Sequence, residues 1–230
     1  SRPTEFFAAL MFDKIDHPFI LTIFGASGDL AKLKIFPALF TLAAQKRLPE
    51  HCLIVGFARS DKSEAEFRQE FCDSVKSACG KGGMSFPYCQ ATIDALLEKV
   101  LYFPGKYDDL YDFERYFDFL REATRKQGME VPPIHVTYFS VPPGVCQPII
   151  HNLAHARSSA KDDIRIVLEK PFGEDEASAT QLFHFLSRYF REDQVFLLDH
   201  YLGKSSVQSI LALRHNNAVL NLLLHGRDIA

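Results

Sequence analysis

Three groups of residues in this sequence are of types that could do chemistry, and the first is a glycine turn. Gly25 and Gly28 stand in the pattern Gly-x-x-Gly-x-x-Ala, which ends at Ala31 and lies between an apolar run and a helical pattern. Glycines let a backbone approach a phosphate closely, and the amides at a helix start carry partial positive charge. The pattern predicts a phosphate-binding turn, although it has one glycine fewer than the usual dinucleotide fingerprint and a plain turn is the alternative.

The other two groups are Glu169-Lys170-Pro171-Phe172-Gly173 and Asp199-His200-Tyr201-Leu202-Gly203-Lys204. A lysine directly before a proline is held extended, and that peptide bond can be cis, which would fix the direction of the ammonium group. The second group combines a histidine, a tyrosine and a lysine within five residues. Asp199 adds a carboxylate that could stabilise a protonated histidine during proton transfer.

Short apolar runs rich in β-branched and aromatic residues predict the strands that position these groups. They cover residues 19–24, 52–57, 100–103, 134–141, 164–168 and 195–198. Helical patterns lie between them: one is capped by Asp29, one is opened by the capping box Ser63-x-x-Glu66, and two follow Asp109 and Gly144. Alternating strands and helices predict an α/β fold with a doubly wound parallel sheet. After Lys204 we expect a helix over residues 202–214 and a new strand over residues 219–224.

The end of the second predicted strand bears on the choice of dinucleotide. It is followed by Arg59 and Ser60. In a dinucleotide fold this strand end meets the adenosine ribose, where an acidic residue binds a free 2′-hydroxyl and an arginine pairs with a 2′-phosphate. Arg59 favours NADP over NAD, although Asp61 is close enough to keep NAD open, and an exposed structural arginine is the alternative.

Composition excludes several classes of function. The chain of 230 residues has a net charge of -3, with 26 basic and 29 acidic residues mixed along it, so we expect no nucleic-acid partner. Its five cysteines have no metal-ligand spacing and predict free thiols of a reducing compartment. His151 and His155 lie four residues apart without a third ligand nearby, so we expect a solvated helix face and no metal.

The apolar runs bear on location. They fall short of the roughly 20 residues that a bilayer requires, so we expect a soluble, cytoplasmic protein without membrane contact. The chain begins at Ser1, and we expect that an original N-terminus preceded it, with an organelle address left open.

Three stretches together, GASGDLAKLK at 25–34, EKPFG at 169–173 and DHYLGK at 199–204, resemble the glucose-6-phosphate dehydrogenase family. Supporting segments at 55–60, 107–109 and 190–194 occur in the order that the family shows. The resemblance implies a Rossmann-like coenzyme domain over residues 1–198, followed at 199–230 by the start of a β+α substrate domain. It also implies oxidation of glucose 6-phosphate at C1 to the lactone with hydride transfer to NADP, the first step of the oxidative pentose phosphate pathway.

The resemblance also implies roles by position. Arg59 would hold the 2′-phosphate, with Lys34 as a second candidate, and the pyrophosphate would be cradled by Gly25, Ala26, Ser27, Gly28, Asp29, Leu30, Ala31 and Lys32. Lys170 would contact both nicotinamide and sugar, and Asp199 would orient the base histidine. The sugar phosphate would be bound by His200, Tyr201 and Lys204.

The base histidine of this family, and the surface through which its subunits pair, would lie beyond Ala230. We therefore expect no turnover by this chain alone, and a homo-oligomer formed through the remainder. Residues 225–228 depart from the family's usual run at the entry to the second domain.

Two alternatives stay open. Proteins similar to glucose-fructose oxidoreductase and inositol dehydrogenases also combine such a fold with Glu-Lys-Pro, but they usually keep three glycines and lack His-Tyr-Leu-Gly-Lys. The other alternative is a non-catalytic module that binds NADP.

Overall fold

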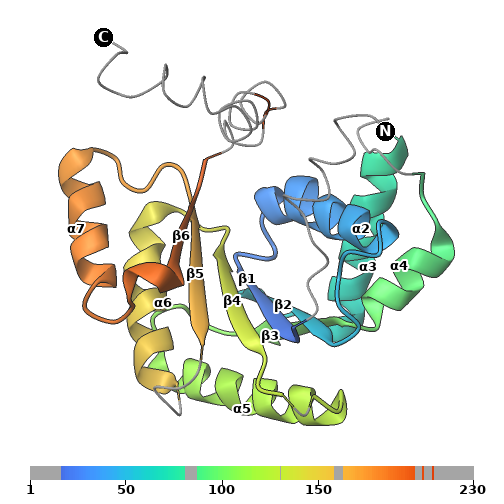
Figure 1. Ribbon diagram of the computed structural model, residues 1–230, viewed down its shortest axis with the longest axis horizontal. Helices are drawn as coiled ribbons and strands as arrows, with labels where there is room; N and C mark the ends of the chain where they lie inside the picture. The colour runs from blue at the N-terminus through green and yellow to red at the C-terminus, as the bar shows by residue number, and fades with distance from the viewer. Residues whose placement is uncertain are drawn as a thin grey trace, which may run out of the picture. The chain divides into compact units, whose positions relative to one another are not determined.

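The computed structural model describes residues 17–80, 87–129, 131–157 and 163–199, together with Lys204 and Ser209. Contacts divide the chain into two compact units, Lys14–Leu197 and a second unit made of Ser1–Asp13 and Leu198–Ala230. The first unit contains the sheet and its helices (Figure 1). The helix expected at 202–214, apart from two residues, and the strand expected at 219–224 lie outside the described residues.

Six strands form one sheet in the order β3-β2-β1-β4-β5-β6. They are β1 Phe19–Phe24, β2 Cys52–Ala58, β3 Val100–Pro104, β4 Ile134–Phe139, β5 Ile164–Glu169 and β6 Val195–Leu198. β1 pairs in parallel with both β2 and β4, β2 pairs in parallel with β3, and β4 with β5. The direction of winding reverses between β1 and β4, which is where sheets of this kind bind ligands. The predicted Rossmann-like, doubly wound α/β fold is confirmed.

Helices cover both faces of this sheet (Figure 1). They are the π-helical turn η1 Ala31–Ile35, α2 Phe36–Ala44, α3 Glu64–Gly80, α4 Gln90–Leu97, α5 Leu110–Lys126, α6 Pro143–Ala156, α7 Glu176–Leu186 and the short 3-10 turn η2 Glu192–Gln194. Successive residues of a strand point to opposite faces. Ile23 of β1 accordingly packs in a core with α2, α3 and α4, whereas Phe24 packs in a second core with α5, α6 and α7.

Two local predictions differ from the structure. Asp29 does not cap the first helix, because helical structure already begins at Asp29, and Leu30, the residue before the π-helical turn, is itself helical (φ -60°, ψ -44°) and makes no side-chain cap. β4 ends at Phe139 rather than at Val141. The amide of Ser140 still bonds to the carbonyl of Phe24, 2.9 Å away, but β1 ends there and offers no further partner.

The remaining expectations about composition concern thiols and membranes. Cys52, Cys72 and Cys146 are buried, in keeping with cysteines that fill the core. Within the described ranges, no helix has both the length and the apolar character needed to cross a bilayer.

Candidate coenzyme-binding site

The carboxyl ends of the strands meet at one edge of the sheet. Phe24, the last residue of β1, lies opposite Phe57 of β2 and Phe139 of β4. Phe139 in turn lies opposite Leu168 of β5. The structure therefore brings together at this edge the residues that directly follow these strands, among them Gly25, Arg59, Ser140 and Lys170.

Gly25 makes the tight turn that the pattern predicts. Its φ is +83°, and a Cβ placed on it would lie 2.2 Å from the main-chain oxygen of Ser140. Its amide donates to the carbonyl of Phe57 at 3.0 Å, and its carbonyl accepts from the amide of Gly28 at 2.9 Å. The backbone thus passes between the ends of β2 and β4 in a space that only glycine fits.

The helix that follows this turn provides the amides expected for a pyrophosphate. Helical structure begins at Asp29, and the first backbone bond along it runs from the amide of Lys32 to the carbonyl of Gly28, 3.3 Å away. Amides of a first helical turn have no carbonyl one turn earlier and carry partial positive charge. Ala26 and Ala31 are fully buried and could offer only their backbone, whereas Gly28 and Asp29 are exposed. These residues fit a dinucleotide phosphate.

Arg59 lies over an aromatic ring at the same edge. Its guanidinium carbon is 5.6 Å from the ring centroid of Tyr107, which is only 7% exposed. Burial raises the pKa of the Tyr107 hydroxyl, while the charge of Arg59 and a backbone hydrogen bond from Gly25 oppose that rise. Tyr107 therefore links the arginine to the glycine turn as a neutral platform. The sequence indicated it only within a family segment, although its place three residues after β3, at this edge, was a usable signal.

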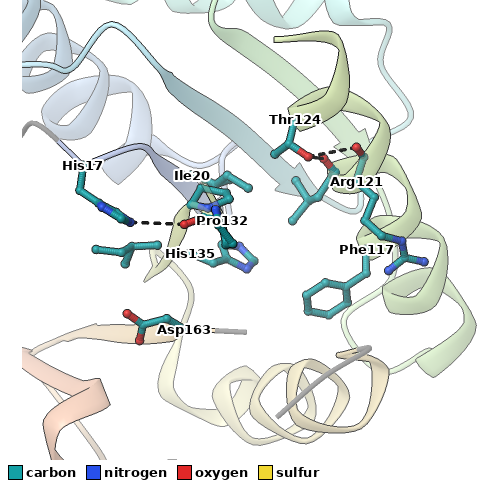
Figure 2. Close-up of a pocket in the computed structure, with 11 residues that line it drawn as sticks. His17, Ile20, Phe117, Arg121, Thr124, Pro132, His135 and Asp163 are labelled. Atoms are coloured by element: carbon teal, nitrogen blue, oxygen red, sulfur yellow. Dashed lines mark hydrogen bonds between the residues drawn. The ribbon is translucent and has the colours of Figure 1, made fainter. Parts of the chain in front are cut away.

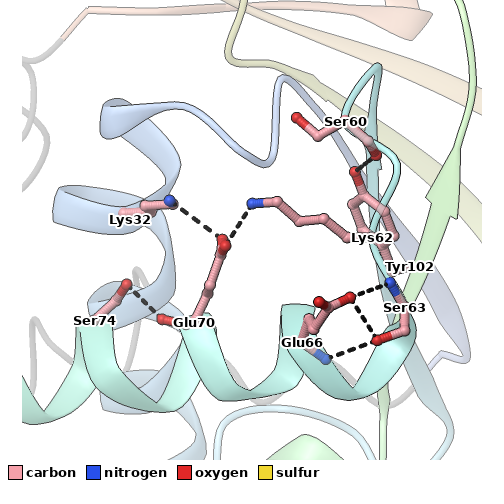
Figure 3. Close-up of polar contacts among 8 residues, drawn as sticks. All are labelled: Lys32, Ser60, Lys62, Ser63, Glu66, Glu70, Ser74 and Tyr102. Carbon is pink, nitrogen blue, oxygen red and sulfur yellow. Dashed lines mark hydrogen bonds and ion pairs between the residues drawn. The ribbon is translucent and has the colours of Figure 1, made fainter.

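Lys32 does not extend into the solvent. Its ammonium is 3.2 Å from Glu70 of α3, and the same carboxylate binds Lys62 at 2.5 Å (Figure 3). Partial burial raises the pKa of Glu70, but hydrogen bonds and charge from the two lysines outweigh it and hold the pKa below its ordinary value. Lys32, which the sequence assigned to the pyrophosphate cradle, is thus tied to the helix that follows β2. Sequence reasoning missed Lys62 and Glu70.

Lys170 leaves the sheet on the other side of the switch point from Arg59. It is exposed, and a cis peptide bond joins it to Pro171, as the sequence allows. The hydroxyl of Tyr138 donates to the carboxylate of the preceding residue, Glu169, which ties the end of β5 to β4.

The other predicted catalytic and substrate residues cannot be placed beside this edge. Asp199 and Lys204 belong to the second unit, and the two units are described separately. His200 and Tyr201 lie outside the described residues. Their roles stay predictions.

A separate pocket lies at the opposite edge of the sheet (Figure 2). It has a volume of about 210 Å³ and is lined by residues at the amino ends of β1, β4 and β5, including Ile20, His135 and Asp163. His135 is 5% exposed, its Nε2 is 2.7 Å from the hydroxyl of Thr22, and burial lowers its pKa to about 3. This neutral, hydrogen-bonded histidine belongs to the core, and the pocket is at the wrong edge for a dinucleotide.

Comparisons with known proteins agree with this geometry. The family model for "Glucose-6-phosphate dehydrogenase, NAD binding domain" matches residues 22–209. The chloroplastic glucose-6-phosphate 1-dehydrogenase of Nicotiana tabacum is 36% identical over 203 residues, which are 88% of this chain and 33% of that protein. Glucose-6-phosphate 1-dehydrogenase 2 of Mycobacterium bovis is 37% identical over 212 residues, 90% of this chain and 40% of that protein.

A solved structure, described as glucose-6-phosphate dehydrogenase in complex with its substrate glucose-6-phosphate, superposes with a TM-score of 0.77 at 32% identity. The match covers 94% of this chain and 43% of that one. The chain spans a third to two fifths of the two curated relatives named above. With its glycine turn and its sheet edge in the expected places, the chain belongs to the glucose-6-phosphate dehydrogenase family and carries the nicotinamide-nucleotide-binding domain of that family.

Proposed function

We propose that this chain is the coenzyme-binding part of an NADP-dependent dehydrogenase that oxidises glucose 6-phosphate at C1 to 6-phosphoglucono-1,5-lactone. The observation that supports it is the arrangement of Gly25, Arg59 and Lys170 at one edge of the sheet, on the two sides of the switch point. The preference for NADP rests on Arg59, because a guanidinium at the end of β2 suits a 2′-phosphate.

Different residues at this edge would bind the coenzyme and the sugar. Backbone amides after Gly25 would bind the pyrophosphate, and Arg59, stacked on Tyr107, would pair with the 2′-phosphate. Lys170, an exposed residue, would donate hydrogen bonds to the sugar and orient it at the sheet edge. The coenzyme, when bound, would supply the hydride acceptor.

The substrate phosphate and the proton would be handled by residues after β6. His200, Tyr201 and Lys204 would bind the phosphate dianion, and Asp199 would orient the histidine that takes the proton from the C1 hydroxyl. Hydride leaves C1 only as this hydroxyl loses its proton. The resemblance assigns that histidine to none of the residues of this chain.

Location and assembly are also part of the proposal. We place the protein in the cytoplasm, as a homo-oligomer without nucleic-acid or membrane partners. The relative from Nicotiana tabacum is a chloroplastic enzyme, so the compartment is a property separate from the fold.

The complete protein that contains this chain tests the proposal. With glucose 6-phosphate and NADP it should form NADPH, Lys170→Ala should abolish turnover, and Lys126→Ala, on the exposed face of α5, should change nothing. His200→Ala should raise KM by roughly tenfold or more through loss of a phosphate contact, with a smaller change in kcat. Binding of NADP without any NADPH formation would mark a non-catalytic module instead. An unchanged KM in His200→Ala would refute its role.

A further inference from the structure

Three charged side chains from three separate segments meet beside the coenzyme edge (Figure 3). Lys32 comes from η1, Lys62 from the loop after β2, and Glu70 from α3. The two ammonium groups lie 3.2 Å and 2.5 Å from the two oxygens of one carboxylate. The side chains remain 32%, 21% and 31% exposed, so the cluster is accessible from solvent.

The cluster lies where an adenosine ribose would be expected. Lys62 is three residues beyond Arg59, at the carboxyl end of β2, and Lys32 follows the glycine turn at the end of β1. These two strand ends are adjacent, because Phe24 lies opposite Phe57. In dinucleotide folds the end of the second strand faces the 2′ position of that ribose.

Packing and hydrogen bonds hold Lys62 in place. The hydroxyl of Tyr102 donates to the carbonyl of Ser60 at 2.6 Å, which anchors the loop before it. The residue after it, Ser63, exchanges hydrogen bonds with Glu66, at 2.8 Å from its amide to the carboxylate and at 3.2 Å from the Glu66 amide to its hydroxyl. Lys62 is thus fixed on both sides, and Glu70 stands one helical turn after Glu66.

The distance of α3 from the sheet is also fixed. Gly56 of β2 allows the ring of Phe67 to lie directly on the strand, since a Cβ at that glycine would be 2.3 Å from Phe67 Cζ. Glu70, three residues further along α3, is therefore held near the loop that carries Lys62.

The two ammonium groups of the cluster share the carboxylate of Glu70, and Glu66 is a further carboxylate whose charge acts on Lys62. A phosphate dianion has several acceptor oxygens, so it could bind the two lysines and the nearby Arg59 together. We propose that Lys62 is a specificity-determining residue for the 2′-phosphate of NADP. In the absence of coenzyme its ammonium group pairs with Glu70, and when NADP binds it pairs with the 2′-phosphate instead. This inference rests on the proposed function and names a residue that selects the coenzyme.

The test compares two ligands that differ by one phosphate. The 230-residue chain is titrated with 2′,5′-ADP and with 5′-AMP by isothermal calorimetry. Lys62→Gln should weaken 2′,5′-ADP binding by about three- to tenfold, as expected for one partly exposed ion contact, and should leave 5′-AMP unchanged. Glu70→Gln should tighten 2′,5′-ADP binding, because it removes the competing carboxylate. Lys62→Arg, which keeps the charge, should retain the preference.

Lys126→Gln is the matched control, because Lys126 pairs with Glu122 at 2.8 Å on α5, away from this edge. If the unmodified chain prefers 2′,5′-ADP but Lys62→Gln loses no more affinity than this control, the inference is overturned and the NADP assignment stands. Weaker 2′,5′-ADP binding by Glu70→Gln would overturn the role of Glu70. An unmodified chain that binds both ligands equally would overturn both the inference and the coenzyme assignment.

Discussion

Replacing Gly25 by alanine should disrupt both the fold and the coenzyme edge. The φ of +83° would cost a non-glycine residue about 1–2 kcal/mol. The added Cβ would also lie 2.2 Å from the main-chain oxygen of Ser140 and 2.9 Å from Cγ1 of Val141. A main-chain oxygen cannot rotate away, so the backbone must shift, and overpacking of this kind costs about 1–3 kcal/mol. We expect a total loss of roughly 2–5 kcal/mol, a large part of the stability of an ordinary domain.

Gly128→Ala provides the matched control. Gly128 also has a positive φ, +63°, but nothing lies within 4 Å of its added Cβ. Gly128→Ala should therefore lower the free energy of unfolding by only about 1 kcal/mol, the cost of placing a non-glycine residue at a positive φ. The sequence has no tryptophan, so urea unfolding is followed by far-UV circular dichroism, with NADP titration as the second readout. Equal midpoints for the two variants, with unchanged NADP binding by Gly25→Ala, would refute the close packing on which the site depends.

Two further predictions concern stability. Burial lowers the pKa of His135 from 6.5 to about 3. Below pH 6.5 the unfolded chain therefore binds a proton at this histidine that the folded chain does not bind. The free energy of unfolding accordingly decreases as the pH falls from 6.5 toward 3. In urea unfolding between pH 7.5 and 5, the free energy of unfolding should fall less steeply for His135→Gln than for the unmodified chain, with a difference in slope that is small above pH 6.5 and approaches about 1.4 kcal/mol per pH unit near pH 5. A slope in the unmodified chain equal to that of His135→Gln would contradict this, and His184→Gln is the exposed-site control. Ser63→Ala, which removes the cap of α3, should cost about 1 kcal/mol in the same assay, and no loss relative to Ser77→Ala would argue against the capping box.

The strands β1, β2 and β3 were predictable because they are largely buried from both sides. Every residue of β2 is buried. The sequence of a strand buried in this way is a continuous apolar run, and the run ends where polar residues or glycine begin. The glycine turn and Arg59 follow directly from these ends. The sheet edge could therefore be assembled from the sequence once the strands were assigned.

The helix α4 could not be predicted in the same way. It has eight residues, its N-cap Cys89 makes no side-chain cap bond, and among its residues only Ile93 and Leu96 are buried. Two apolar positions three residues apart do not distinguish a helix from a loop. The π-helical turn at Ala31–Ile35 could not be predicted either. The apolar residues of the helix that follows have the same spacing whether or not one π-helical turn precedes them.

The cluster of Lys32, Lys62 and Glu70 could not be predicted from the spacing of residues in the sequence. Lys32 and Glu70 are 38 residues apart, and each alone resembles a charge on a solvated helix face. Only the packing of α3 on β2 through Gly56 brings them together with Lys62. Tertiary contact, rather than local pattern, decides which surface charges form a site.

The central claim is that this sheet edge binds a phosphorylated nicotinamide nucleotide. It is tested most directly by titrating the 230-residue chain, and its Arg59→Ala variant, with NADP and with NAD. We predict that the unmodified chain binds NADP about tenfold or more tightly than NAD, as expected when one charged contact is added, and that Arg59→Ala removes most of this difference while NAD binding is unchanged. Equal affinity of the unmodified chain for the two nucleotides, or a preference that survives undiminished in Arg59→Ala, would contradict the account.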